Sequence, residues 1–188
     1  WFLFHIMEQK PKKYNKKTEE KDMSNTVLKR EEIIKSSSEY FKGDALAADV
    51  WVNKYALRDG EKIYELNPDQ MHRRLAKEFA RIENKYENPL SEQEIYELLK
   101  DFKYIIPQGS PMAGIGNDFQ VVSLSNCFVI GNAANSDSYG GILKIDEEQV
   151  QLMKRRGGVG HDLSHIRPKF SPVKNSALTS TGIVPFME

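Results

Sequence analysis

The redox chemistry open to this chain depends on one residue. Cys127 is the only cysteine among the 188 residues, and it lies in the apolar run SLSNCFVI. A glycine-rich stretch, RRGGVGHDLSHIRPK (Arg155 to Lys169), follows after a loop and a helix-like segment. A thiol near backbone that can approach a ligand closely suggests an enzyme that acts on nucleotides. A dithiol mechanism would need a second cysteine, which these residues do not contain.

The glycine-rich stretch also allows other chemistry. His161 and His165 are four residues apart and could share one helix face to bind a metal ion, but a glycine and a proline flank them and no third ligand is evident. The run RGGVGHDLS has Leu163 at the third glycine position of the dinucleotide fingerprint and lacks the Lys-Ser/Thr ending of a phosphate loop. We therefore expect no metal site, and the loop alone supports phosphate binding only weakly.

Cys127 has two further interpretations. With His161 or His165 as the base, it could be the nucleophile of a cysteine hydrolase, which requires an activated thiolate. A lone cysteine in an apolar run is more often a buried packing residue. The residues alone leave the redox, hydrolytic and packing roles open.

The first half of the chain is predicted to be helical. Residues 28–41 and 44–55 are helix candidates, the second with Leu46, Val50 and Trp51 on one side. Asn67-Pro68 and the capping box Ser91 to Glu94 mark the starts of two more helices. Their apolar residues recur at helical spacing: Met71, Leu75, Phe79, Ile82 and Tyr86 in one helix, and Ile95, Leu98, Leu99 and Phe102 in the other.

The pattern changes at Pro107. The run PQGSPMAGIGN is too rich in glycine and proline for a regular element, and residues 120–130 are predicted to form a largely buried strand with Cys127 near its C-terminal end. A loop over residues 131–141 leads into a helix that ends at Lys154-Arg155-Arg156, where Gly157 can supply a left-handed cap. The strand-like run GVGHDLSHI follows, and this alternation predicts an α/β fold.

Composition restricts the class of protein. Lys+Arg and Asp+Glu both number 27, so the charge gives no sign of a nucleic-acid or anionic membrane partner. No apolar run is long enough to span a bilayer, and we interpret residues 1–25 as a disordered leader. One cysteine excludes an internal disulfide and fits a reducing compartment, which predicts a cytoplasmic protein.

The combination of motifs is more specific than its parts. It consists of GSPMAGIGN, SLSNCFVI, DSYGGI, LMKRRGGVGHDLSHIRPK and SPVKNSALTSTGIVPFME. In order and spacing these motifs resemble the first part of the catalytic barrel of ribonucleotide reductase large subunits. The upstream run VWVNKYALRDGEKIYELNPDQMHRRLAKEFARIE resembles the helical segment that precedes this barrel. The resemblance covers roughly residues 31–188 and is closest to the adenosylcobalamin-dependent class II form.

The resemblance implies an α/β fold with two parts. A helical N-terminal region over residues 26–106 is expected to precede the first strands of a ten-stranded α/β barrel over residues 107–188. Trp1 is not an initiator residue, and the chain stops at Glu188 in an apolar run without a cap or turn. We therefore expect an N-terminal fragment with an incomplete barrel.

The resemblance also implies a reaction. In this family a thiyl-radical cysteine removes the ribose 3'-hydrogen, and two further cysteines reduce the 2'-carbon as they form a disulfide. Cys127 matches the first of these two and is the expected catalytic residue of a ribonucleoside-diphosphate reductase. The fragment is expected to be inactive alone. The complete enzyme is expected to be a homodimer that uses adenosylcobalamin and an external dithiol such as thioredoxin.

Three residues match substrate-contacting positions of the family. Ser110 falls at a hydroxyl residue that bonds the ribose or phosphate, and Asn126 directly precedes Cys127. Gly158 matches a glycine whose backbone borders the substrate, where a Cβ would block close approach. The alternatives are a turn serine for Ser110 and a helix cap for Gly158.

Four more residues match or lie near positions that bind a deoxynucleoside triphosphate or ATP effector. They are Asp137, Ser138, Arg167 and Lys174. Two cations suit a triphosphate, although Lys174 is equally compatible with solvated surface charge. The alternative function is a non-catalytic nucleotide-binding or regulatory module, which would keep this effector site without the chemistry.

Overall fold

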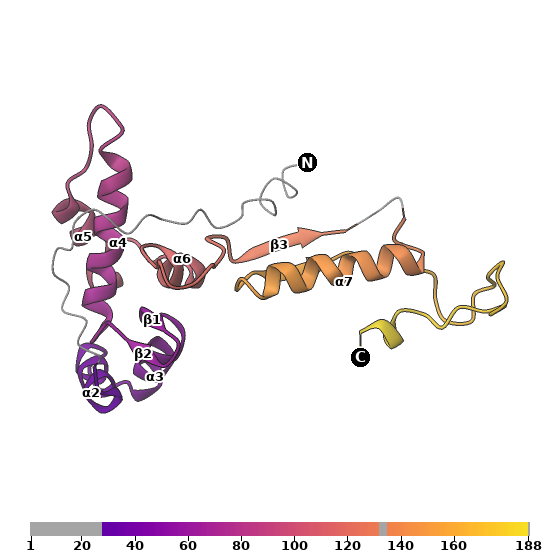
Figure 1. The fold of residues 1–188 in the computed structure, drawn as a ribbon, viewed down its shortest axis with the longest axis horizontal. Helices are drawn as coiled ribbons and strands as arrows, with labels where there is room; N and C mark the ends of the chain where they lie inside the picture. Colours follow the sequence, from indigo (N-terminus) through magenta and orange to yellow (C-terminus); the bar gives the residue numbers. More distant parts are fainter. Residues whose placement is uncertain (1–27, 132–134, 188) are drawn as a thin grey trace.

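A computed structural model of the chain describes residues 28–131 and 135–187. The predicted leader, residues 1–25, lies outside this range. Helices and short strands gather at one end of the molecule, and a strand-helix-strand unit and a C-terminal segment extend from them (Figure 1). The helical part contains α2 (Arg30–Tyr40), α3 (Ala45–Lys54), β1 (Arg58–Asp59), β2 (Lys62–Ile63), α4 (Pro68–Glu83), α5 (Glu92–Leu99), η1 (Lys100–Phe102) and α6 (Gly109–Gly114). The second part contains β3 (Cys127–Ile130), α7 (Tyr139–Met153), β4 (Gly158–His161) and η2 (Val184–Phe186).

Local sequence signals define the helix starts. Asp44 caps α3 by accepting a hydrogen bond from the Ala47 N–H at 2.9 Å. Asn67 caps α4, which has proline in its first turn, as the sequence predicts. The predicted capping box of α5 is confirmed, because the Ser91 N–H donates to Glu94 Oε2 at 2.8 Å and the Glu94 N–H donates to Ser91 Oγ at 3.2 Å.

The core lies among these helices. Its largest fully buried side chains include Trp51, Ile33, Met71, Leu75 and Leu99. The Trp51 indole N–H donates to the sulfur of Met71 at 3.3 Å. The predicted apolar faces are only partly buried, since Leu46 is 74% exposed and Tyr86 lies beyond the end of α4. Residues 28–103 are mainly helical, as predicted.

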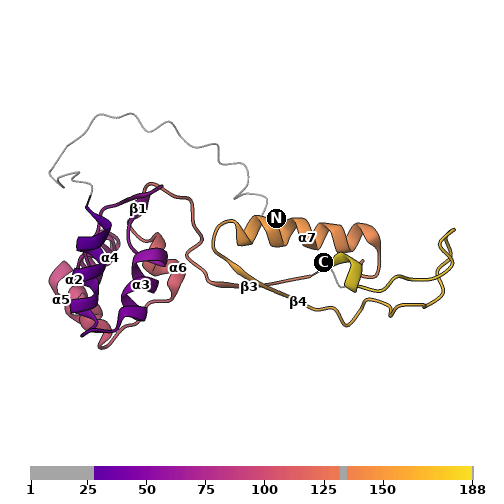
Figure 2. The same ribbon diagram turned by 90° about the horizontal axis from the view of Figure 1, so that it is seen from below.

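Strands β3 and β4 are parallel neighbours, and α7 connects them. Parallel strands need such a crossover because a tight turn cannot reverse the chain twice. Figure 2 shows α7 along one side of the two strands. The helical region followed by this unit confirms a mixed α/β fold.

Three local predictions are wrong. Residues 109–114 form the short helix α6 rather than a loop, because proline is accepted in a first helical turn and burial of Met112 and Ala113 stabilises that turn. The strand is shorter and more exposed than predicted: β3 begins at Cys127, and Val129 is 91% exposed because no third described strand or second layer covers it. The left-handed residue after α7 is Arg156, with φ of 69°, rather than Gly157.

None of the described helices is both long and apolar enough to cross a bilayer.

Candidate functional site

The parallel strands place the thiol beside a glycine. Cys127 and Gly158 are register partners at the start of β3 and β4. The Gly158 N–H donates to the Asn126 carbonyl at 2.5 Å, and a Cβ on Gly158 would lie 3.1 Å from that oxygen. Cys127 is exposed, so it does not pack inside the described part of the chain. The thiol is therefore open to a ligand, with unbranched backbone next to it.

Ser110 and Asn126 join this pair through hydrogen bonds. The Ser110 N–H donates to Asn126 Oδ1 at 2.8 Å, and Ser110 Oγ donates to the Arg156 carbonyl at 3.3 Å. These bonds tie the start of α6 to the residue before β3 and to the turn before β4. The structure thus brings together the predicted catalytic and substrate-binding residues Ser110, Asn126, Cys127 and Gly158, which we call the Cys127 cluster.

Sequence reasoning missed three residues that surround the Cys127 cluster. Gln108 Oε1 accepts from Asn126 Nδ2 at 2.6 Å and so fixes the orientation of that amide. Arg156 Nη2 donates to the Lys54 carbonyl at 2.6 Å, which links the turn before β4 to the end of α3. The Tyr55 ring would lie 3.1 Å from a Cβ on Gly109, so this position favours glycine. No sequence signal marks them, because each acts through a partner distant in the chain.

His161 does not pair with Cys127, and the two histidines do not share a helix face. His161 is the register partner of Ile130 at the far end of the two strands. That end is three residues, or about 10 Å along the strand, from Cys127. This distance is too long for a cysteine–histidine hydrogen bond. His161 lies on strand β4, so it shares no helix face with His165. His165 Nε2 instead lies 3.7 Å from Asp162 Oδ2. Residues 28–131 and 135–187 contain no group of three or more His, Cys, Asp or Glu side chains that could hold a metal ion.

Gly158→Ala is expected to lower stability by about 1 kcal/mol, because its Cβ must displace the Asn126 carbonyl by a few tenths of an ångström. Gly160→Ala is the matched control, because Gly160 lies on the same strand and a Cβ there would meet no atom within 4 Å. Thermal unfolding of both variants measures the difference. Equal unfolding midpoints would contradict the close approach at Gly158.

A cavity of about 570 Å³ lies at the other end of α7. This volume is within the range of small-molecule sites. All four predicted effector residues, Asp137, Ser138, Arg167 and Lys174, line it. The remaining lining residues come mainly from the C-terminal segment: Tyr139, Ile142, Ile166, Pro172, Val173, Asn175, Thr179, Ser180, Thr181, Gly182 and Phe186.

An ion pair organises the polar side of the cavity. Arg167 Nε lies 2.8 Å from Asp137 Oδ2, and the Arg167 backbone N–H donates to Asp137 Oδ1 at 3.1 Å. The backbone hydrogen bond, followed by the guanidinium, holds the pKa of Asp137 below its usual value. Arg167 Nη1 also donates to the Pro172 carbonyl at 3.3 Å. Asp137 thus fixes both the backbone and the side chain of Arg167.

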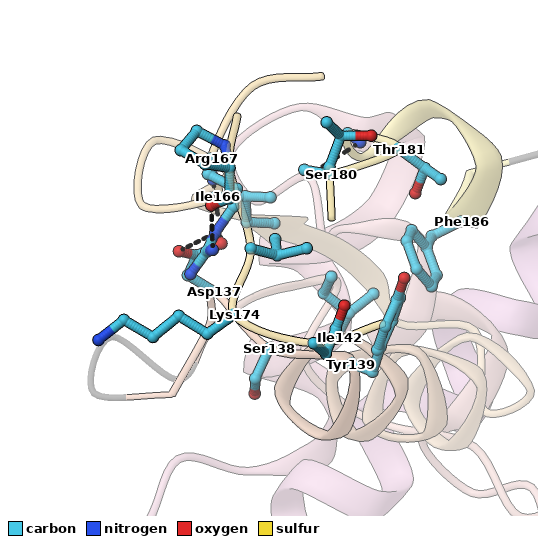
Figure 3. Close-up of a pocket in the computed structure, with 15 residues that line it drawn as sticks. Asp137, Ser138, Tyr139, Ile142, Ile166, Arg167, Lys174, Ser180, Thr181 and Phe186 are labelled. Carbon is cyan, nitrogen blue, oxygen red and sulfur yellow. Dashed lines mark hydrogen bonds and ion pairs between the residues drawn. The ribbon is translucent and has the colours of Figure 1, made fainter. Parts of the chain in front are cut away.

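The rest of the cavity divides into a charged and an aromatic side. Figure 3 shows the Asp137–Arg167 pair on one side and Tyr139 and Phe186 on the other, with the Lys174 side chain extending away from them. The two aromatic rings have centroids 5.5 Å apart. Ser138 caps α7 by accepting from the Gly141 N–H at 3.1 Å, so the positive end of the helix dipole faces this region. The described lining thus combines an Arg–Asp ion pair, a helix N-terminus and two aromatic rings.

Helix α7 connects the two places. It begins at the Ser138 cap beside the cavity, and the chain leaves its C-terminal turn directly into Gly157 and Gly158. Its 15 residues span about 22 Å. The cavity and the Cys127 cluster are therefore separate sites at opposite ends of one helix.

Comparison with known families agrees with this architecture. Residues 41–117 match the family model of the ribonucleotide reductase all-alpha domain, and residues 125–188 match that of the ribonucleotide reductase barrel domain. A search of curated proteins gave no match. The two matched ranges follow each other along the chain and correspond to the helical part and to the strand-helix-strand part with the C-terminal segment. The chain therefore belongs to the ribonucleotide reductase family.

Proposed function

We propose that this chain supplies one of the two reducing thiols of a ribonucleotide reductase, and that Cys127 is this thiol. The observation that carries the proposal is the register of Cys127 with Gly158, next to Ser110 and Asn126. A ribose ring needs room beside the reacting sulfur, and a glycine leaves that room. Family membership supports ribonucleotide reduction in general, and the geometry supports the role of this residue.

The proposed reaction balances with two thiols. The ribose 2'-hydroxyl leaves as water, a hydrogen takes its place, and two thiols give up two electrons and two protons as their sulfurs join in a disulfide. A thiyl radical on another cysteine starts the reaction by removing the ribose 3'-hydrogen and returns it at the end. The 188 residues contain Cys127 alone, so the second reducing thiol and the radical cysteine come from elsewhere. An external dithiol such as thioredoxin then reduces the disulfide.

The other members of the Cys127 cluster are proposed substrate contacts. Ser110 is 2% exposed and its hydroxyl donates to the Arg156 carbonyl, so its proposed contact with the ribose requires that this hydroxyl become uncovered when substrate binds. The Asn126 side chain is held from both ends by Gln108 and Ser110. A polar side chain fixed in this way, on the residue that precedes Cys127, suits a ribose hydroxyl because it loses little freedom on binding.

The cavity at the start of α7 is the proposed effector site. A triphosphate fits Arg167, Lys174 and the helix N-terminus, while the base fits the Tyr139–Phe186 side. We propose a deoxynucleoside triphosphate or ATP as the ligand and a homodimer as the complete assembly. The rival function, a non-catalytic nucleotide-binding module, requires this cavity but gives Cys127 no role.

We also propose that the complete enzyme contains a ten-stranded α/β barrel and belongs to the adenosylcobalamin-dependent class II form. Strands β3 and β4 would be two neighbours among ten, and the 91% exposure of Val129 supports further strands and a second layer around them. In the class II form, bound adenosylcobalamin supplies the radical. The residues of this chain that we propose to take part in the reaction are those of the Cys127 cluster.

The function is tested by product formation. The enzyme that carries this chain should convert ribonucleoside diphosphate to the deoxyribonucleotide when supplied with a dithiol, and omission of adenosylcobalamin should stop the reaction. The isolated 188 residues should give no product, since they hold one thiol. Chromatography of the nucleotides provides the measurement. Turnover without adenosylcobalamin would reject the class, whereas nucleotide binding without any turnover would favour the regulatory module.

A further inference from the structure

We propose that Glu65 and Arg74 act as a positioning pair for the Cys127 cluster, an inference that rests on the proposed function. Neither residue belongs to the cluster or to the effector cavity. The pair lies in the helical part, between α4 and the loop that follows β2. Its hydrogen bonds reach the C-terminal end of α6, the helix whose first turn carries Ser110.

The pair is buried and well bonded. Arg74 Nε lies 2.7 Å from Glu65 Oε1 and Nη2 lies 3.3 Å from Oε2, with side chains 9% and 6% exposed. Glu65 Oε2 also accepts from the Leu57 N–H at 2.7 Å. Buried charges are costly unless their hydrogen bonds are complete. The bonds of Arg74 beyond Glu65 therefore matter as much as the ion pair.

These additional bonds cap α6. Arg74 Nη2 donates to the Met112 carbonyl at 3.0 Å, and Nη1 donates to the Ile115 carbonyl. The last carbonyls of a helix lack partners within it, so the guanidinium supplies partners that the helix cannot. The chain turns away at Gly116, with φ of 69°, where a Cβ would lie 2.8 Å from Arg74 Cγ. Arg74 is thus in close contact with both the end of α6 and the turn after it.

The short length of α6 makes this anchor important. A helix of six residues is not stable by itself, and this one spans about 9 Å. Its C-terminal end is fixed by Arg74. At its N-terminal end Ser110 bonds Asn126 and Arg156. Movement at the Arg74 end would therefore be transmitted to Ser110 and, through its hydrogen bond with Asn126, to the residue that directly precedes Cys127.

Arginine is needed at this position for its shape as well as its charge. The planar guanidinium group of Arg74 donates to both carboxylate oxygens of Glu65 and to the carbonyls of Met112 and Ile115 at once. Lysine has the same charge but a single ammonium group, which cannot reach all four acceptors. Arg74→Lys therefore keeps the ion pair and frees the end of α6.

Hydrogen exchange of the 188-residue chain tests the anchor. Arg74→Lys should speed exchange of the amides in residues 109–116 at least about tenfold, because loss of even one of the two hydrogen bonds from the charged guanidinium to Met112 and Ile115 would give that change. Exchange in α2 and α5 should stay as in the wild type. Arg73→Lys is the matched control, because Arg73 is the neighbour on α4, is 57% exposed and pairs with Asp69 instead. Unchanged exchange in residues 109–116, or equal acceleration throughout the helical part, would overturn the proposal.

A second variant and a kinetic measurement complete the test. Glu65→Gln keeps the side-chain size and should accelerate exchange in the same residues if Arg74→Lys does not fold. In the active enzyme, Arg74→Lys should raise KM for the ribonucleotide about tenfold and leave effector affinity unchanged, because only the Ser110 end is disturbed. Faster exchange with an unchanged KM would overturn the positioning role. Absence of activity in the wild type would instead count against the proposed function, since the exchange result does not depend on turnover.

Discussion

Cys127→Ser is expected to abolish multiple turnover of the enzyme that carries this chain while leaving nucleotide binding intact. Serine has nearly the same size and remains polar, but its hydroxyl cannot form a disulfide with a second thiol. The exposed position at the start of β3 means that the change should cost little stability. The measurement is deoxyribonucleotide formed per active site, with a dithiol in excess.

Val129→Ser is the matched control for this experiment. Val129 lies two residues along β3, on the same face as Cys127, and both side chains are exposed. Val129→Ser introduces the same hydroxyl on this face without removing the thiol. The folded fraction of Val129→Ser should therefore keep turning over, in contrast to Cys127→Ser. Turnover of Cys127→Ser at nearly the wild-type rate would remove Cys127 from the chemistry.

Arg167→Ala is expected to weaken effector binding by about 1.5–3 kcal/mol, the contribution of hydrogen bonds from a charged donor. This corresponds to roughly a ten- to 150-fold rise in Kd. The loop should stay in place, because the main bond that lowers the pKa of Asp137 comes from the backbone N–H of residue 167, which alanine keeps. Calorimetric titration with a deoxynucleoside triphosphate measures the change.

Lys169→Ala is the control for charge alone. Lys169 is a nearby exposed cation that does not line the cavity, and its ammonium lies 5.1 Å from the Phe170 ring centroid. Its loss should change affinity by less than about 0.5 kcal/mol. Basal ribonucleotide reduction should persist in both variants, since the Cys127 cluster lies at the far end of α7. An unchanged Kd in Arg167→Ala would reject the effector assignment.

The helical part of the fold could be predicted well because its signals are local. Caps at Asn67 and Ser91 and apolar residues at helical spacing lie within one helix each. Helix α6 could not be predicted this way. Its glycines and proline disfavour a helix, and its stability comes from Met112 in the core and from the distant Arg74. Tertiary contacts outweighed local propensity there.

The candidate site was predictable to a similar extent. The resemblance pointed to Ser110, Asn126, Cys127 and Gly158, and the structure brings them together, although their roles stay predictions. The supporting residues Gln108, Arg156 and Glu65 were missed because each bonds a partner far along the chain. Sequence patterns report spacing within an element, whereas these contacts depend on how elements pack.

The contact between Arg156 and Lys54 also bears on the order of folding. It joins residues 102 positions apart, and the Ser110–Arg156 bond joins residues 46 apart. Such contacts require closure of long loops and form slowly compared with neighbouring helices. We expect the helices to fold first and the strands to dock onto them afterwards. The thiol would then acquire its neighbours in the last stage of folding, so the substrate site proposed beside Cys127 would not exist in a nascent chain until the strands have docked.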